Sequence, residues 1–134
     1  MSADAAWHLA HVRALAYMGD AVYEMHVRER VLRTNPGMVD ALHRTTVRRV
    51  SAEGQAEMAE RLLPLLSEEE QSIYRRARNH KGMASTGRAS ARAYRLSTAF
   101  EAVLGYLYLK PAPGRLAELL ALTDTWTEEM TDAP

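Results

Sequence analysis

The chain has 134 residues, a length that fits one domain and leaves little room for a second. Its 17 basic and 17 acidic residues cancel, and a neutral total argues against a nucleic-acid binder, because such domains are usually basic. The absence of cysteine excludes disulfides and thiolate zinc sites, and since neither a membrane-spanning run nor a secretory signal is found, we expect a cytoplasmic protein.

The first half of the chain is predicted to be helical. Alternating strand patterns are absent, and the abundant residues are good helix formers. The turn residues at 35–37 end the first helix, which can bend at Gly19, and Ser51 is placed to cap the third. The helices expected in this half are Ala5–Arg33, Val39–Val50 and Ser51–Leu63.

The second half is predicted to contain three more helices and one long loop. Ser67 and Glu70 have the spacing of a capping box, which marks the start of a helix. Residues 79–90 contain two glycines and no apolar periodicity, so we expect a loop there. The expected helices are Ser67–Arg78, Ala91–Leu109 and Arg115–Glu129. The whole chain, 1–134, is therefore expected to be a single all-α domain with its core over about 8–129.

Two acidic residues interrupt otherwise apolar helices. Asp20 is the only charge from Ala14 to Tyr23, and Glu101 is the only charge from Ala99 to Leu109. A helix that is apolar around most of its circumference is usually buried, so both carboxylates are expected to be buried as well. Gly19 and Gly105 lie near these acids, which predicts close helix packing or close approach of a ligand.

Such buried acids have two interpretations. Each could pair with an arginine, since arginine is plentiful, or both could face one cleft and share a divalent cation. Carboxylates without histidine or cysteine nearby suit Mg²⁺ or Mn²⁺ better than zinc. Glu24 lies one turn after Asp20 and could support such a cation or pair with Arg28.

The neutral total conceals a basic segment. Seven basic residues and no acidic one fall between Arg75 and Arg95, while the other ten basic residues stand against all 17 acidic ones. A charge run is commonly a solvated surface, but a run of a single sign repels itself unless an anion is present. Beside a candidate metal site, it favours contacts with the phosphates of a nucleic acid. The basic residues of the segment are Arg75, Arg76, Arg78, Lys81, Arg88, Arg92 and Arg95.

The two acidic helices resemble the signatures of the ribonuclease III family. Leu15–Glu24 (LAYMGDAVYE) is similar to its first catalytic helix, and Ser97–Leu109 (STAFEAVLGYLYL) is similar to its second. No double-stranded-RNA-binding domain is present, and SAEGQAE at 51–57 and RARNHK at 76–81 are similar to the compact Mini-ribonuclease III branch. The resemblance covers about His11 to Leu122.

This resemblance implies a Mg²⁺-dependent endonuclease that cuts double-stranded RNA as a homodimer, with precursor 23S ribosomal RNA as its substrate and no membrane partner. Mn²⁺ could substitute for Mg²⁺. Asp20 and Glu101 align with catalytic, metal-binding carboxylates. Two further acids of ribonuclease III are replaced here by Ala16 and Thr98, and Thr98 could hydrogen-bond a metal water. Tyr17 aligns with an aromatic residue that reaches across the dimer interface.

The implied products carry a 5′ phosphate and a 3′ hydroxyl. Two other readings remain open: a non-catalytic module of the same fold that binds structured RNA or assembles with partners, and a helical protein-interaction domain. In the RNA-cleaving reading, the residues expected to contact RNA are Arg76, Arg78, Lys81, Arg88, Arg92 and Arg95.

Overall fold

The computed structural model describes residues 11–34, 37–80 and 90–132, and within these ranges it contains helices and no strand. The all-α prediction is confirmed. The predicted start of the first helix at Ala5 lies outside the described residues, as does most of the loop predicted over 79–90. The elements are α2 (Val12–Thr34), α3 (Val39–Val50), α4 (Ala52–Leu62), the 3₁₀ turn η1 (Leu63–Leu65), α5 (Glu68–Arg78), α6 (Ala91–Leu109) and α7 (Pro113–Asp132).

Serine side chains cap three of these helices. The hydroxyl oxygen of Ser51 accepts from the backbone N–H of Gly54 at 3.1 Å, as predicted from the sequence. Ser67 and Glu70 form the predicted capping box, and Ser90 caps α6. Helix α7 begins at Pro113, two residues before the predicted start, because the first turn of a helix does not need the N–H that proline lacks.

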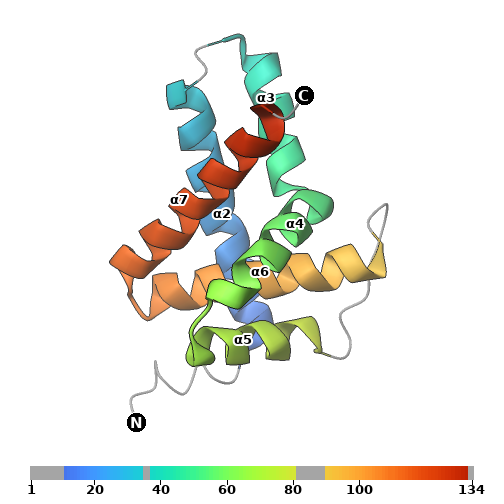
Figure 1. The fold of residues 1–134 in the computed structure, drawn as a ribbon, viewed down its shortest axis with the longest axis vertical. Helices are drawn as coiled ribbons and strands as arrows, with labels where there is room; N and C mark the ends of the chain where they lie inside the picture. The colour runs from blue at the N-terminus through green and yellow to red at the C-terminus, as the bar shows by residue number, and fades with distance from the viewer. Residues whose placement is uncertain (1–10, 35–36, 81–89, 133–134) are drawn as a thin grey trace.

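Helix α6 is the centre of the molecule. In Figure 1, α2 crosses behind it, α4 crosses in front of it and α5 runs alongside it, while α7 leads away from its C-terminal end and across α2. Twelve of its 19 residues are buried, so its apolar sequence is explained by contact with neighbours on nearly all sides. The rings of Phe100 on α6 and Tyr23 on α2 meet edge to face with centroids 4.8 Å apart.

Two glycines bring the backbones of α2 and α6 into direct contact. A Cβ atom added at Gly19 would lie 1.7 Å from the carbonyl oxygen of Glu101, and one added at Gly105 would lie 1.9 Å from that of Leu15. No side chain fits at either position, which confirms the predicted close packing. The same crossing brings the carboxylate of Asp20 to that of Glu101.

A buried polar cluster joins α7 to α2 and α3. Arg49 donates to Asp124 at 2.9 Å and to the hydroxyls of Tyr23 and Thr123 at 3.2 Å, and His26 lies 3.0 Å from Asp124. Burial acts to raise the pKa of Asp124, but hydrogen bonding and attraction to His26 and Arg49 outweigh it and hold that pKa below its usual value. The cluster fixes α7 in place.

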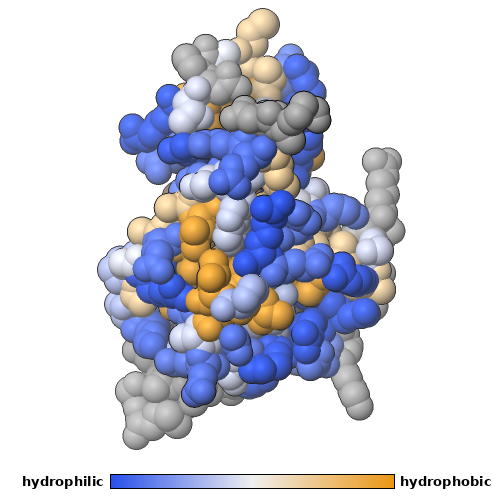
Figure 2. Space-filling model, viewed as in Figure 1, coloured by the Kyte–Doolittle hydropathy of each residue, from blue (hydrophilic) through white to orange (hydrophobic). Residues whose placement is uncertain are grey.

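The face of the molecule seen in Figure 2 is mostly hydrophilic. Figure 2 shows that the most strongly apolar patch on this face lies near the centre, where α7 lies beside the end of α4. None of the helices in the described part of the chain is long and apolar enough to cross a membrane.

Candidate metal centre

The crossing of α2 and α6 places Asp20 and Glu101 in contact, although they lie in distant parts of the sequence. Their side chains are hydrogen-bonded to each other. Glu101 is partly buried, whereas Asp20 is exposed, so the expected burial of Asp20 is wrong. The physical reason is that α2 has one face open to solvent, which also carries Tyr17 and Met25.

Among the described residues, no cation offsets the charge of this pair. Burial, the hydrogen bond to Asp20 and repulsion by its carboxylate together raise the pKa of Glu101 to about 9. Within the described ranges, neither carboxylate forms an ion pair with arginine or lysine, so the arginine-paired interpretation is not what the structure shows. A divalent cation would relieve this repulsion.

A third polar side chain, Gln55 on α4, reaches the pair and was not identified from the sequence. Its amide hydrogen-bonds to Glu101 and acts to lower the pKa of that carboxyl. Its Nε2 also donates to the carbonyl oxygen of Val50 at 3.0 Å. Its position in the sequence could have indicated this role, because Gln55 shares one helical face with Ala59 and Leu62, which are buried. A polar side chain on a buried face needs a hydrogen-bond partner.

The two residues expected to support the pair lie nearby in sequence but are engaged elsewhere. Glu24 accepts a hydrogen bond from Arg28 at 3.3 Å, which is the second of its two predicted roles. Thr98 is buried on α6 and donates to the carbonyl oxygen of Tyr94 at 2.9 Å, which leaves its oxygen free to accept.

The donor set fits a small, hard cation. Carboxylate and amide oxygens are ligands that Mg²⁺ accepts, and Mg²⁺ commonly uses only one or two protein carboxylates and completes its shell with water and phosphate. No cluster of three or more histidine, cysteine or acidic residues suited to a metal occurs in the described residues.

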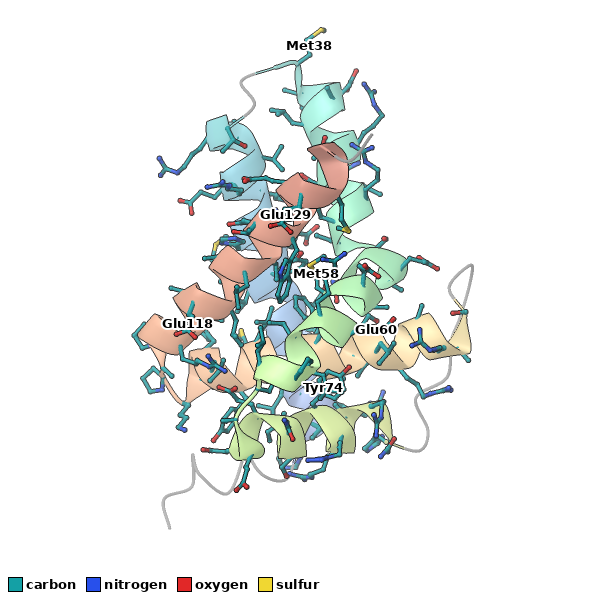
Figure 3. All side chains as sticks on the ribbon, viewed as in Figure 1. Met38, Met58, Glu60, Tyr74, Glu118 and Glu129 are labelled. Atoms are coloured by element: carbon teal, nitrogen blue, oxygen red, sulfur yellow. The ribbon has the colours of Figure 1, made fainter. Side chains whose placement is uncertain are left out.

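The basic segment is only partly available to a ligand. Arg92 donates to Glu60 of α4 at 3.1 Å, and this hydrogen bond holds the pKa of Glu60 below its usual value; Figure 3 labels Glu60 beside α6. The guanidinium of Arg78 lies over the ring of Tyr74 at 6.0 Å from its centroid. Two other expected contacts are exposed, Arg76 and Arg95, and two lie outside the described residues, Lys81 and Arg88.

The exposed face of α2 beside Asp20 is apolar. Tyr17 is 85% exposed and Met25 is 69% exposed, and Ala21 lies between them at helical spacing. Large apolar side chains in such a row commonly mark an interaction surface.

Comparison with known proteins fixes the family. A model of the ribonuclease III domain matches residues 13–111, a range that contains Asp20, Gln55 and Glu101. The chain belongs to the ribonuclease III family. The Mini-ribonuclease 3 of Symbiobacterium thermophilum is 47% identical to this ribonuclease III-family chain over 106 residues, which are 79% of the chain and 82% of the relative. The Mini-ribonuclease 3 of Gloeobacter violaceus is 48% identical over 113 residues, which are 84% of this chain and 82% of that relative.

The ribonuclease III-family chain also shares its fold with a solved structure. A crystal structure of a protein from Fusobacterium nucleatum superposes with a TM-score of 0.78 and 24% identity, and the match covers 87% of this chain and 93% of the other. The resemblance carried by the two helical signatures is therefore confirmed in sequence and in fold.

Proposed function

We propose that this chain is a Mg²⁺-dependent endoribonuclease that cuts double-stranded RNA as a homodimer in the cytoplasm, with precursor 23S ribosomal RNA as its substrate. The observation that carries the proposal is the contact between Asp20 and Glu101 without a cationic partner among the described residues. The relatives named Mini-ribonuclease 3 support the substrate class.

In this proposal Asp20 and Glu101 hold the cation. When bound, Mg²⁺ supplies charge neutralisation at the phosphate and activation of the attacking water. Asp20 is exposed and can meet the phosphate backbone, whereas the partly buried Glu101 is held by Gln55 and by the α2–α6 crossing. Thr98, one turn before Glu101, offers an acceptor oxygen to bound water. Hydrolysis leaves a 5′ phosphate and a 3′ hydroxyl.

Basic side chains bind the duplex by its phosphates. Arg76 at the end of α5 and Arg95 in α6 are exposed and suited to such contacts, which recognise shape more than sequence. Lys81, Arg88 and Arg92 belong to the same basic segment. Because the net charge is zero, affinity for the duplex is expected to be modest and strongly salt-dependent.

A second copy of the chain covers the apolar face of α2. Tyr17 and Met25 on that face flank Asp20, so a two-fold interface there would place one site from each chain near the other. Each site then cuts one strand of the duplex.

The test is incubation of the purified protein with long duplex RNA in Mg²⁺ and in EDTA. The proposal predicts shortening of the RNA in Mg²⁺ and none in EDTA, with single-stranded RNA of the same sequence as the control. A mobility shift without shortening would indicate a binding module, and neither effect would indicate an interaction domain. Both results contradict the proposed activity.

A further inference from the structure

The side chain of Gln55 has one buried polar atom without a partner. Gln55 is 2% exposed, and its Oε1 accepts no hydrogen bond from any described residue. The orientation of the amide is fixed by its neighbour, because the carbonyl oxygen of Val50 can only accept and so must face Nε2. Oε1 is therefore on the other side of the carboxamide.

A buried acceptor without a donor is costly. Leaving such a group unsatisfied costs about 1–3 kcal/mol, so native structures rarely retain one without a ligand, an ion or water. Nε2 of the same carboxamide donates toward Glu101, so Oε1 lies within one amide group of the carboxylate pair. The missing donor is therefore expected at that pair.

A hydrated cation provides such a donor. Mg²⁺ bound by two carboxylates keeps several waters, and each of these waters is a strong hydrogen-bond donor. Asp20 and Glu101 serve as ligands of the cation, so a neutral acceptor next to them is free to receive one of those hydrogens. A third carboxylate there would add repulsion to an already negative site, which a neutral carboxamide avoids.

We propose that Gln55 is a positioning residue of the cation site: its Nε2 holds the carboxylate of Glu101 and its Oε1 accepts a hydrogen bond from water in the hydration shell of the cation. This inference rests on the proposed function, since it assumes that Asp20 and Glu101 bind a divalent cation. Hydrogen-bond partners of this kind typically change metal affinity by about 10- to 100-fold.

The competing explanation is purely structural. The bond from Nε2 to Val50 ties the start of α4 to the end of α3, and a variant of Gln55 could weaken cation binding simply because this junction loosens. Ser51 provides a matched control, because its hydroxyl caps the first turn of α4 through Gly54. Ser51→Ala loosens the start of α4 without removing a group that contacts Glu101.

The experiment measures Mn²⁺ affinity of the full chain without RNA, from the electron paramagnetic resonance signal of free Mn²⁺. Gln55→Met keeps the length of the side chain and removes both polar atoms, and its Kd is expected to rise by about 10- to 100-fold. Ser51→Ala is expected to stay within about twofold of the parent.

Circular dichroism first establishes that each variant is folded. If Gln55→Met does not fold, Gln55→Asn takes its place. It shortens the side chain by one methylene, so the oxygen no longer reaches the site, and the same rise in Kd is expected. An unchanged Kd in the Gln55 variant, or an equal loss in Ser51→Ala, overturns the positioning role. If Asp20→Asn binds Mn²⁺ as the parent does, the proposed function fails and this inference with it. Loss of binding in Asp20→Asn with normal binding in Gln55→Met overturns this inference alone.

Discussion

Replacement of Gly19 by alanine tests how the two carboxylates are brought together. The added Cβ would lie 1.7 Å from the carbonyl oxygen of Glu101, while ordinary contacts begin at about 3.4 Å, so the helices must separate by more than about 1 Å. The obstacle is backbone of the central helix and cannot rotate away. Overpacking of this kind costs about 3 kcal/mol, which lowers Tm by roughly 10 °C for a chain of this size.

Thermal denaturation followed by circular dichroism measures this loss, and Mn²⁺ titration of the folded variant measures the displacement of Asp20 from Glu101. Gly114→Ala is the matched control, because no atom lies within 4 Å of a Cβ there and the change favours the helix. A Gly19→Ala protein with the Tm and the Mn²⁺ affinity of the parent would refute the close-contact argument.

Three further predictions concern charged side chains. In EDTA, raising the pH from 6 to 9 should lower the free energy of unfolding of the parent more than that of Glu101→Gln, as measured by urea denaturation. The reason is that the folded Glu101 carboxyl, with its pKa of about 9, retains a proton that the unfolded chain has released. An equal pH dependence of the two proteins contradicts this prediction. Asp124→Asn should lower the free energy of unfolding by about 3 kcal/mol at pH 7, since it leaves the buried guanidinium of Arg49 without its anion. A decrease of less than about 1 kcal/mol in urea denaturation would contradict this prediction. Replacing both Arg76 and Arg95 by alanine should lower by about two the slope with which the logarithm of duplex affinity falls with the logarithm of salt concentration. Arg92→Ala should change this slope less, because the Arg92 side chain is already ion-paired with Glu60. Fluorescence anisotropy at several salt concentrations measures the slope, and an unchanged slope in the double variant contradicts these contacts.

The helices and their ends could be predicted from local chemistry. Ser51 and Ser67 mark helix starts through hydrogen bonds made within a few residues, which is information that a short stretch of sequence contains. The pairing of Asp20 with Glu101 could be anticipated because each interrupts an apolar helix. The glycine at 19 indicated the close approach that the structure shows.

Features that depend on how distant helices meet could not be predicted. The exposure of Asp20 depends on which side of α2 remains uncovered, and an apolar pattern around most of the helix does not specify that side. The ion pair of Arg92 with Glu60 joins α6 to α4 across a long sequence separation. Gln55 was missed for the same reason, because its partner Glu101 lies on another helix.

The pair Asp20 and Glu101 is the centre of this account, and single-turnover cleavage of duplex RNA tests it most directly. Asp20→Asn and Glu101→Gln are close in size to the parent side chains, and each removes a carboxylate that would hold the cation. With saturating protein and Mg²⁺, either variant is expected to bind the duplex and to cleave it at least about 1,000-fold more slowly than the parent, a loss of about 4 kcal/mol in transition-state stabilisation. Cleavage by a folded variant within about tenfold of the parental rate would contradict the account.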